Sequence, residues 1–111
     1  MKHVTFNTGA ALLDALVLSA VSKMDTYGYK ITQDVRDVVD VSESTLYPVL
    51  RRLQKNGYLA AYDQEFAGRN RRYYTITPEG EEKLVECRQE WTEYRGRIEN
   101  LLFGGSNDEK N

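Results

Sequence analysis

Residues 44–59 read STLYPVLRRLQKNGYL, and this stretch decides the fold. Its apolar residues recur at the spacing of one helix face, which predicts a helix with one buried side: Leu46, Val49, Leu50 and Leu53. Ser42 or Ser44 can cap its start, and Gly57 suits the left-handed turn that ends many helices. Pro48 removes one backbone hydrogen bond, but the apolar period continues unbroken across it and favours a single helix.

The opposite face of this helix carries polar and basic side chains. With about 3.6 residues per turn, the residues that gather there are Ser44, Pro48, Arg51, Arg52 and Lys55, with Tyr47 on the flank. A helix that is buried on one side and cationic on the other is suited to lie against a negatively charged partner.

Two segments rich in aromatic and β-branched residues follow this helix. They are YLAAYDQEF (58–66) and RRYYTIT (71–77), and AGRN (67–70) joins them. The pattern predicts a β-hairpin whose turn places Gly68 and Asn70 at positive φ. Between Glu65 and the end of the second segment there are three arginines and no acidic residue, so the hairpin concentrates positive charge next to the cationic helix.

The segment before the central helix predicts two more helices. Residues 9–24 are apolar on nearly every side, so a helix formed there needs cover all round. In so small a domain this suggests that a second chain covers Leu12 and Leu16. A second helix is expected to start after Asp25 or Thr26, both good N-caps, with its apolar residues on one face: Tyr27, Ile31, Val35 and Val38.

A last helix is predicted from Thr77-Pro78, an N-cap followed by a proline at the first helical position, to about Phe103. Its apolar residues fall into two series at seven-residue spacing: Leu84, Trp91 and Ile98, and then Cys87, Tyr94 and Leu101. Such a seam is typical of a coiled coil between chains, although many amphipathic helices simply pack on their own domain. The strict spacing, together with the apolar first helix, favours a homodimer.

Composition excludes several functional classes. With 111 residues, 41% hydrophobic and 29% charged, the chain is one domain of ordinary globular composition. One cysteine and one histidine can build neither an internal disulfide nor a zinc site from those ligands. No phosphate-binding loop or acid–base group set indicates an enzyme or a cofactor. The N-terminus lacks a secretion signal and no apolar run could cross a membrane, so the expected location is the cytoplasm.

Charge is unevenly distributed along the chain. The net charge is −2, which by itself argues against a nucleic-acid partner. Residues 42–77, however, hold six basic and three acidic residues, whereas residues 78–103 hold four basic and seven acidic ones. A phosphate backbone responds to the local field and not to the sum, so residues 42–77 are the candidate for DNA contact.

Three motifs carry a resemblance to a known family: YGYKI (27–31), STLYPVLRRLQKNGYL (44–59) and GRNRRYYTITPEG (68–80). In this order and spacing they resemble the PadR family of bacterial transcriptional regulators, in its short subfamily with one C-terminal helix, over about residues 10–102. The resemblance implies a mainly α fold with a small β-hairpin, namely a winged helix-turn-helix followed by a dimerisation helix. It also implies a homodimer that binds a palindromic operator, usually represses, and is often released by a small aromatic ligand.

The expected organisation is a flexible N-terminus (1–8), a winged helix-turn-helix DNA-binding domain (9–77), a dimerisation helix (78–103) and a disordered tail (104–111). In a winged helix the recognition helix enters the major groove and the hairpin reaches the phosphate backbone or the minor groove. The residues expected to contact DNA are Tyr29, Lys30, Ser44, Thr45, Tyr47, Arg51, Lys55, Arg69, Asn70, Arg71 and Arg72.

Some of these residues also have a simpler interpretation. Thr45 could serve only as a helix cap, and Tyr47 could be half-buried with just its hydroxyl on a phosphate. The basic hairpin tip could be an ordinary solvated loop. A winged helix can also use this same surface to bind another protein instead of DNA.

The predicted dimer interface consists of Leu12, Leu16, Leu84, Cys87, Trp91, Tyr94, Ile98 and Leu101. Related multidrug-sensing regulators sandwich flat compounds between paired tryptophans, and Trp91 is central on this seam. A buried aromatic pair is more often plain interface core, so both interpretations stay open. Arg88 and Arg95 lie within one helical turn of Trp91 and would suit an anion such as a phenolic acid, which makes these three residues the candidate effector site.

Overall fold

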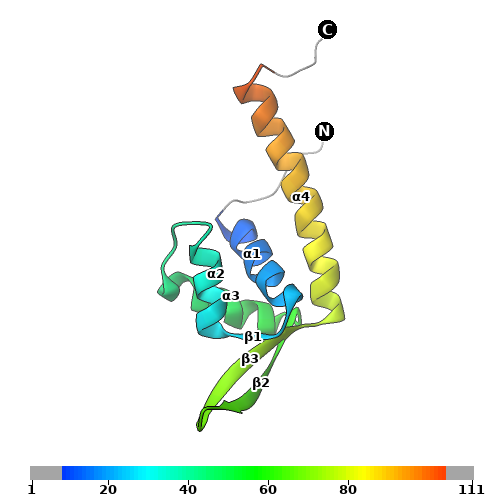
Figure 1. Cartoon of the computed structure of the whole chain (residues 1–111). Coiled ribbons are helices and arrows are strands. Elements are labelled where there is room, and N and C mark those ends of the chain that lie inside the picture. Colours follow the sequence, from blue (N-terminus) through cyan, green and yellow to red (C-terminus); the bar gives the residue numbers. More distant parts are fainter. Residues whose placement is uncertain (1–8, 105–111) are drawn as a thin grey trace.

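The computed structural model describes residues 9–104. The chain runs through α1 (Ala10–Lys23), β1 (Thr26–Tyr27), α2 (Gly28–Arg36), α3 (Glu43–Lys55), β2 (Leu59–Phe66), β3 (Arg69–Ile76) and α4 (Pro78–Leu102). The first three helices form a body, the hairpin of β2 and β3 projects from one end, and α4 extends past the body at the other end (Figure 1). The expected fold class, mainly α with a small β element, is confirmed. The predicted flexible segment 1–8 and nearly all of the predicted tail 104–111 lie outside the described residues.

One hydrophobic core joins the helices to the sheet. The stripe predicted on α3 is buried, since Leu46, Leu50 and Leu53 have no exposed surface and Val49 is 7% exposed. It packs with apolar residues from the other elements: Val17, Leu18, Val21, Ile31, Val35, Leu59, Tyr74 and Leu84. Truncating a buried leucine in such a core costs roughly 2–5 kcal/mol, so this stripe fixes α3 against the body.

Both ends of α3 follow from its sequence. The Ser42 Oγ accepts a hydrogen bond from the Thr45 backbone N–H at 3.2 Å, which satisfies one of the donors that a helix start leaves free. At the other end Gly57 has φ +84°, the left-handed conformation predicted for it. The helix runs through Pro48 without ending, as its apolar period predicted.

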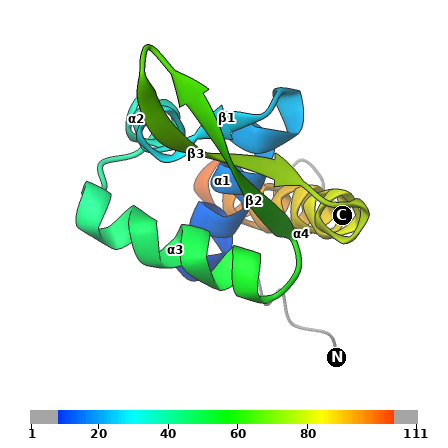
Figure 2. The ribbon, with the colours of Figure 1, turned by 90° about the horizontal axis from the view of Figure 1, so that it is seen from below.

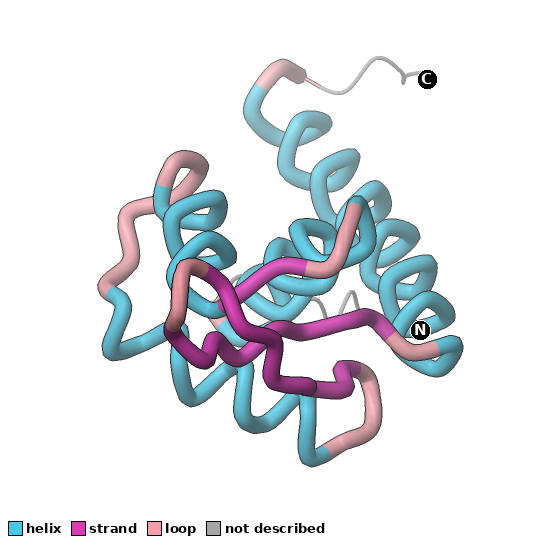
Figure 3. The backbone as a smooth tube through the Cα atoms, turned by 60° about the horizontal axis from the view of Figure 1, so that its bottom comes forward, coloured by secondary structure: helices cyan, strands magenta, loops and turns pink. Residues whose placement is uncertain are grey.

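The sheet of the described chain has three antiparallel strands in the order β1–β3–β2. β2 and β3 pair along their whole length. β1 adds two pairs at the base of the hairpin, Thr26 with Tyr74 and Tyr27 with Tyr73 (Figure 3). Residues 63–72 therefore extend beyond the three-stranded part as a two-stranded ribbon, which is called the wing below.

The start of α4 leaves room for only the smallest residue. Thr77 caps the helix by accepting a hydrogen bond from the Gly80 N–H at 2.9 Å, and Pro78 takes the first helical position, as predicted. A Cβ added to Gly80 would lie 2.1 Å from the carbonyl oxygen of Tyr58. The helix thus leaves the sheet in contact with the backbone that enters β2.

Two local expectations were wrong. The second helix does not start after Asp25 or Thr26, because β1 occupies residues 26–27 and α2 follows without a side-chain cap. The hairpin turn does not use Asn70, which lies in β3. Its two residues are Ala67 and Gly68, with φ of +54° and +79°, and two positive φ values in a two-residue loop suit the twist of a hairpin.

Helix α1 is not covered on every side by the other elements of the described chain. Val17, Leu18 and Val21 are buried, while Leu12 and Leu16 are only half-buried. Beyond the end of α2, Val38 is 67% exposed and does not continue the buried face predicted for that helix. None of the helices within residues 9–104 is long and apolar enough to cross a bilayer.

Candidate nucleic-acid interface

Helix α3 and the wing lie at the end of the molecule opposite the free end of α4 (Figure 1). Viewed from below, α3 runs across this end and the hairpin lies beside it (Figure 2). The polar residues predicted on the DNA-facing side of α3 are all exposed: Ser44, Thr45, Tyr47, Arg51 and Lys55. Arg51 and Lys55 form no ion pair with a carboxylate of residues 9–104, so both charges are available to a partner.

The start of α3 presents hydroxyl groups. Ser42 is the cap, and the Thr45 Oγ1 lies 3.0 Å from the Ser42 Oγ, so Thr45 is not the capping residue. Tyr47 is 36% exposed, so part of its ring is covered by the body. The pKa of the Tyr47 phenol is raised, mainly by burial and to a lesser extent by the negative charge of Glu43. The phenol therefore stays protonated at neutral pH and can donate a hydrogen bond. A Cβ added to Gly28 would lie 3.2 Å from the Tyr47 ring, so this glycine lets α2 and α3 approach.

Arg52 does not belong to the cationic face, which corrects its placement there by periodicity. Its guanidinium donates two hydrogen bonds to Asp14 of α1, from Nη2 to Oδ1 at 2.7 Å and from Nη1 to Oδ2 at 3.1 Å. The Asp14 side chain is only 14% exposed. The hydrogen bond with Asp14 raises the pKa of Arg52. Arg52 therefore ties α3 to α1, and sequence reasoning did not identify Asp14.

A groove of about 610 Å³ opens where the start of α2, α3 and the wing meet. Its lining residues come from three separate sequence motifs. Five of them are predicted DNA contacts: Tyr29, Tyr47, Asn70, Arg71 and Arg72. The lining residues are Tyr27, Gly28, Tyr29, Tyr47, Asn70, Arg71, Arg72 and Tyr74.

The predicted cations around this groove differ in their present partners. Arg69 is exposed and pairs with no carboxylate within residues 9–104. Arg72 makes a loose contact of 3.8 Å with Asp63, and both side chains are about 60% exposed (60% and 59%). Lys30 donates a 2.7 Å hydrogen bond to Asp34, which raises the pKa of Lys30. All three cations are on the surface, where ion pairs such as those of Arg72 and Lys30 are weak.

Arg71 differs from the other cations of the wing. It is half-buried, and its guanidinium carbon lies 4.1 Å from the centre of the Tyr27 ring and 4.5 Å from that of Phe66. Both distances are within the range of cation–π contacts. Sequence reasoning missed Tyr27 and Phe66, although the tyrosine belongs to the YGYKI motif.

The predicted dimer seam divides into a covered and an exposed part. Leu84 and Cys87 are each 2% exposed and pack within the protomer, so almost no surface of theirs is left for a second chain and their assignment to the interface is corrected. Further along α4, Trp91 is 37%, Ile98 41% and Leu101 84% exposed, and Tyr94 is half-buried with its ring 6.3 Å from that of Trp91.

An apolar hollow of about 350 Å³ lies between α1, the segment after α2, and α4. Arg88 and Trp91 of the candidate effector site line it, together with Leu12, Leu16 and Cys87. Burial raises the pKa of the Cys87 thiol, which keeps it protonated and unreactive. Arg95 does not line the hollow, and its Nε lies 3.9 Å from a carboxylate oxygen of Glu99 instead. The structure thus brings two of the three candidate residues together.

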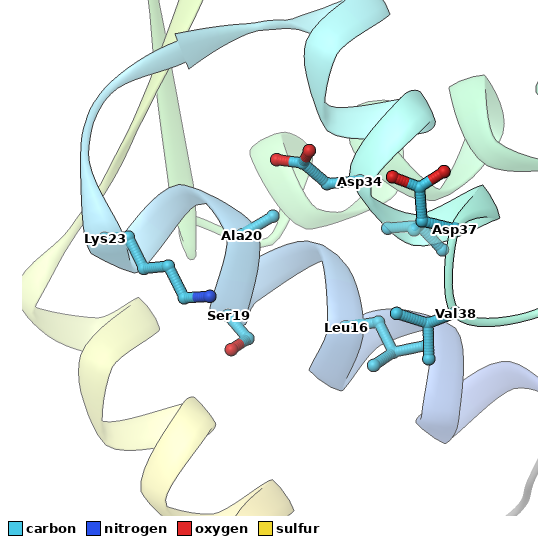
Figure 4. A pocket seen from close by; sticks show the side chains of 8 residues that line it. Leu16, Ser19, Ala20, Lys23, Asp34, Asp37 and Val38 are labelled. Atoms are coloured by element: carbon cyan, nitrogen blue, oxygen red, sulfur yellow. The ribbon is translucent and has the colours of Figure 1, made fainter.

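A neighbouring hollow of about 300 Å³ lies between α1 and α2. Lys23 of α1 points toward it from one side, and Asp34 and Asp37 lie on the other side (Figure 4). Leu16 lines both hollows, so the uncovered side of α1 is continuous from one to the other. In the part of the chain that the structure describes, no cluster of acidic, histidine or cysteine side chains could hold a metal ion.

Comparison with known proteins adds a family match. The model of the transcriptional regulator PadR-like family matches residues 17–86. The transcriptional regulator Rv3488 of Mycobacterium tuberculosis is 36% identical over 74 residues, which cover 66% of this chain and 69% of that protein.

Two solved structures share the fold. The crystal structure of smu.1704 from Streptococcus mutans UA159 is 41% identical and superposes with a TM-score of 0.84, covering 95% of this chain and 99% of that one. Bacillus subtilis PadR in complex with operator DNA superposes with a TM-score of 0.61 over 68% of this chain and 45% of that one. Its sequence is 22% identical, so this likeness concerns the fold.

Proposed function

The chain belongs to the PadR-like family of transcriptional regulators, and from this premise we propose that it is a homodimeric repressor of a palindromic DNA operator. The observation that carries the proposal is the groove in which the start of α2, the exposed side of α3 and the wing meet. These are the parts that a winged helix applies to DNA. The family consists of regulators and not of enzymes.

We assign base reading to the exposed side of α3 from its start to Arg51. Its hydroxyl groups and Arg51 project from the side that can enter a major groove, and the forked guanidinium of Arg51 suits the two acceptors of a guanine. Lys55 stands three turns from the start of the helix and is better placed for a phosphate. Tyr29 and Lys30, at the start of α2, flank the groove and would hold the backbone on the other side.

We assign sequence-independent attraction to the wing. Arg69 and Arg72 are exposed near the turn, and each can exchange its solvent or loose ion pair for a phosphate. Asn70, exposed between them, can add a short polar contact. The acidic net charge of the chain does not oppose this binding, because residues 42–77 carry a local excess of positive charge and many of the acidic residues belong to α4.

A palindromic operator needs two recognition helices related by a two-fold axis, at half-sites about one helical turn apart. The predicted seam residues left exposed along α4 include Trp91, Ile98 and Leu101, and the uncovered side of α1 offers Leu12 and Leu16. Apolar surface of this extent on one protein usually marks an interface. We therefore propose that α4 pairs with a second copy of the chain.

A ligand is a second element of the proposal. The apolar hollow next to Trp91 has about 350 Å³, within the range of small-molecule pockets, and Arg88 supplies a positive charge at its edge. An aromatic carboxylic acid would place its ring on the indole and its carboxylate on Arg88. Because Trp91 is the single tryptophan of the chain, its fluorescence would report binding directly. An effector would be established if the same acid lowered the affinity of the protein for the operator. The operator should then lower the affinity for the acid by the same factor.

Selection of duplexes from a random pool tests the central proposal. Repressor function predicts an enriched inverted repeat, and wild-type binding to it should be specific by roughly 10³-fold or more over random DNA. The alternative, a winged helix that binds a protein partner, predicts no enriched sequence and only weak duplex binding. Insertion of half a helical turn between the half-sites should abolish tight binding, because the two recognition helices would then face different sides of the duplex.

A further inference from the structure

A cluster of aromatic rings covers the outer face of the sheet, on the side opposite the core residue Tyr74. Tyr27, Tyr73 and Tyr62 occupy one row across β1, β3 and β2. The ring centres of Tyr73 lie 5.7 Å from those of both neighbours, stacked on Tyr62 and edge-on to Tyr27. Such spacings are those of favourable aromatic pairs, so the cluster fastens the base of the hairpin.

The same cluster is anchored to the body. The Tyr62 hydroxyl donates a 2.8 Å hydrogen bond to the carboxylate of Asp25, in the connection between α1 and β1. Tyr27 is the residue immediately before α2. The rings therefore link the hairpin to the segment that leads into the helix-turn-helix.

Arg71 connects this aromatic cluster to the wing through its contacts with Tyr27 and Phe66. Phe66 is the last residue of β2 before the turn, and it is 53% exposed. The Arg71 guanidinium lies between its ring and that of Tyr27, at 4.5 Å and 4.1 Å from the two centres. The contact thus spans the distance from the tip of the wing to the base of the sheet.

The wing has little else to fix its direction. β1 pairs only as far as Tyr27 and Tyr73, so residues 63–72 are a two-stranded ribbon, and such ribbons are marginal when isolated. The ion pair between Arg72 and Asp63, at 3.8 Å, joins two residues of the same ribbon, so it cannot set the angle between the wing and the body.

We propose that Arg71 is a positioning residue: held between Tyr27 and Phe66, its guanidinium fixes the wing relative to α2 and α3 and does not itself bind a phosphate. This inference rests on the proposed DNA-binding function. It divides the three arginines of the wing into two kinds. Arg69 and Arg72 contact the DNA backbone, and Arg71 holds them in place by contacts that water and salt disturb little.

The experiment compares three variants of the full chain: Arg71→Gln, Phe66→Ala and the matched control Arg69→Gln. Binding to a short random-sequence duplex is measured by fluorescence anisotropy across a salt series. Amide hydrogen exchange of residues 63–72 is followed without DNA, and thermal melting reports the global fold. Phe66→Ala removes no charge, so it isolates the positioning effect from electrostatics.

We expect Arg71→Gln and Phe66→Ala each to weaken binding by roughly two- to fivefold, the size of an exposed cation–π contact. The slope of log affinity against log salt should stay that of the wild type in both, whereas Arg69→Gln should lower it by roughly 0.9, one phosphate contact. A further variant, Arg71→Gln combined with Phe66→Ala, should bind no more weakly than Arg71→Gln alone, since without the guanidinium Phe66 has no cation contact left to lose. Exchange across residues 63–72 should accelerate while the melting temperature stays unchanged.

A slope lowered by Arg71→Gln as much as by Arg69→Gln would overturn the proposal, and so would unaltered exchange of the wing in Arg71→Gln or Phe66→Ala. If the wild type binds no duplex, the proposed function fails, and the exchange measurement alone then decides whether the guanidinium holds the wing.

Discussion

The guanidinium of Arg52 on α3 donates two hydrogen bonds, of 2.7 Å and 3.1 Å, to the carboxylate of Asp14 on α1. Two bonds in parallel fix an orientation as well as a distance. This contact orients α3 against α1 through a residue adjacent in sequence to Arg51, which we assign to base reading. In the proposed function, neighbouring arginines of one helix would therefore have separate roles, one in the fold and one at the DNA.

Asp14→Ala should destabilise the protein by about 1 kcal/mol. The pair is partly buried on the carboxylate side but 43% exposed on the Arg52 side, so solvent limits its contribution. Urea denaturation measures the loss. The matched control is Asp34→Ala, which breaks the exposed pair with Lys30 and should destabilise the protein less, because solvent weakens a pair on the surface. Equal losses in the two variants would show that the link between α1 and α3 adds nothing to the fold.

Gly80→Ala should destabilise the protein by roughly 2 kcal/mol or more, because the added methyl group meets the Tyr58 carbonyl oxygen at 2.1 Å and must displace α4. Gly96 lies in the same helix with open space around its Cβ position. Gly96→Ala should therefore be neutral or stabilise the helix by up to about 1 kcal/mol. Thermal melting of the two variants, measured side by side, separates a steric requirement from helix propensity; a neutral Gly80→Ala would contradict the close approach.

The sequence predicts the elements whose signals are local. The period of α3, the cap at Thr77 and the glycine after α3 each depend on a few neighbouring residues, and all three are found. β1 could not be predicted in this way, because a two-residue strand has no period and exists only through its pairing with β3. The hairpin turn was predicted in part: Gly68 has the expected positive φ, but the second residue of the turn is Ala67 and not Asn70, although asparagine carries the better turn signal.

The candidate site was harder to predict where one sequence pattern is compatible with two different packing arrangements. A seven-residue repeat describes a seam between chains as well as a helix packed on its own domain, and Leu84 and Cys87 take the second role. Periodicity also placed Arg52 beside Arg51 on the cationic face. One signal could have separated them: Asp14 is the only charged residue between Ala10 and Ser22, and a lone carboxylate in an apolar helix indicates a basic partner.

The double variant Arg69→Ala, Arg72→Ala should weaken all duplexes by similar factors. Each lost phosphate contact should lower the slope of log affinity against log salt by roughly 0.9, so the two together should lower it by roughly twice that. Arg97→Ala on α4 removes one positive charge at the far end of the molecule and should leave the slope unchanged. If the control and the double variant show the same slope, the wing does not touch DNA.

Arg51→Ala should cost about 1–3 kcal/mol on the best operator and less on random DNA, with preference relaxed at one base position per half-site. Lys55→Ala should instead weaken operator and random duplex alike. Competition titrations with single-base operator variants make the comparison. A uniform loss in Arg51→Ala would reduce this arginine to a phosphate contact.

Ile98→Asp should dissociate the proposed dimer. Ile98 is 41% exposed on the protomer, and an aspartate there would be buried without a partner in an interface formed by α4, at a cost of several kcal/mol. Light scattering at micromolar concentration should show a dimer for the wild type and a monomer for the variant. Operator binding should be lost although α3 and the wing are unchanged, since one recognition helix reads only half of a palindrome.

The control is Val85→Asp, which puts the same charge on another side of α4, where Val85 is 51% exposed beside Gln89 and Thr92. That variant should remain a dimer and bind operator normally. A wild type that is monomeric under these conditions, or an Ile98→Asp variant that stays dimeric, would remove α4 from the interface and leave its exposed apolar residues without the role assigned to them.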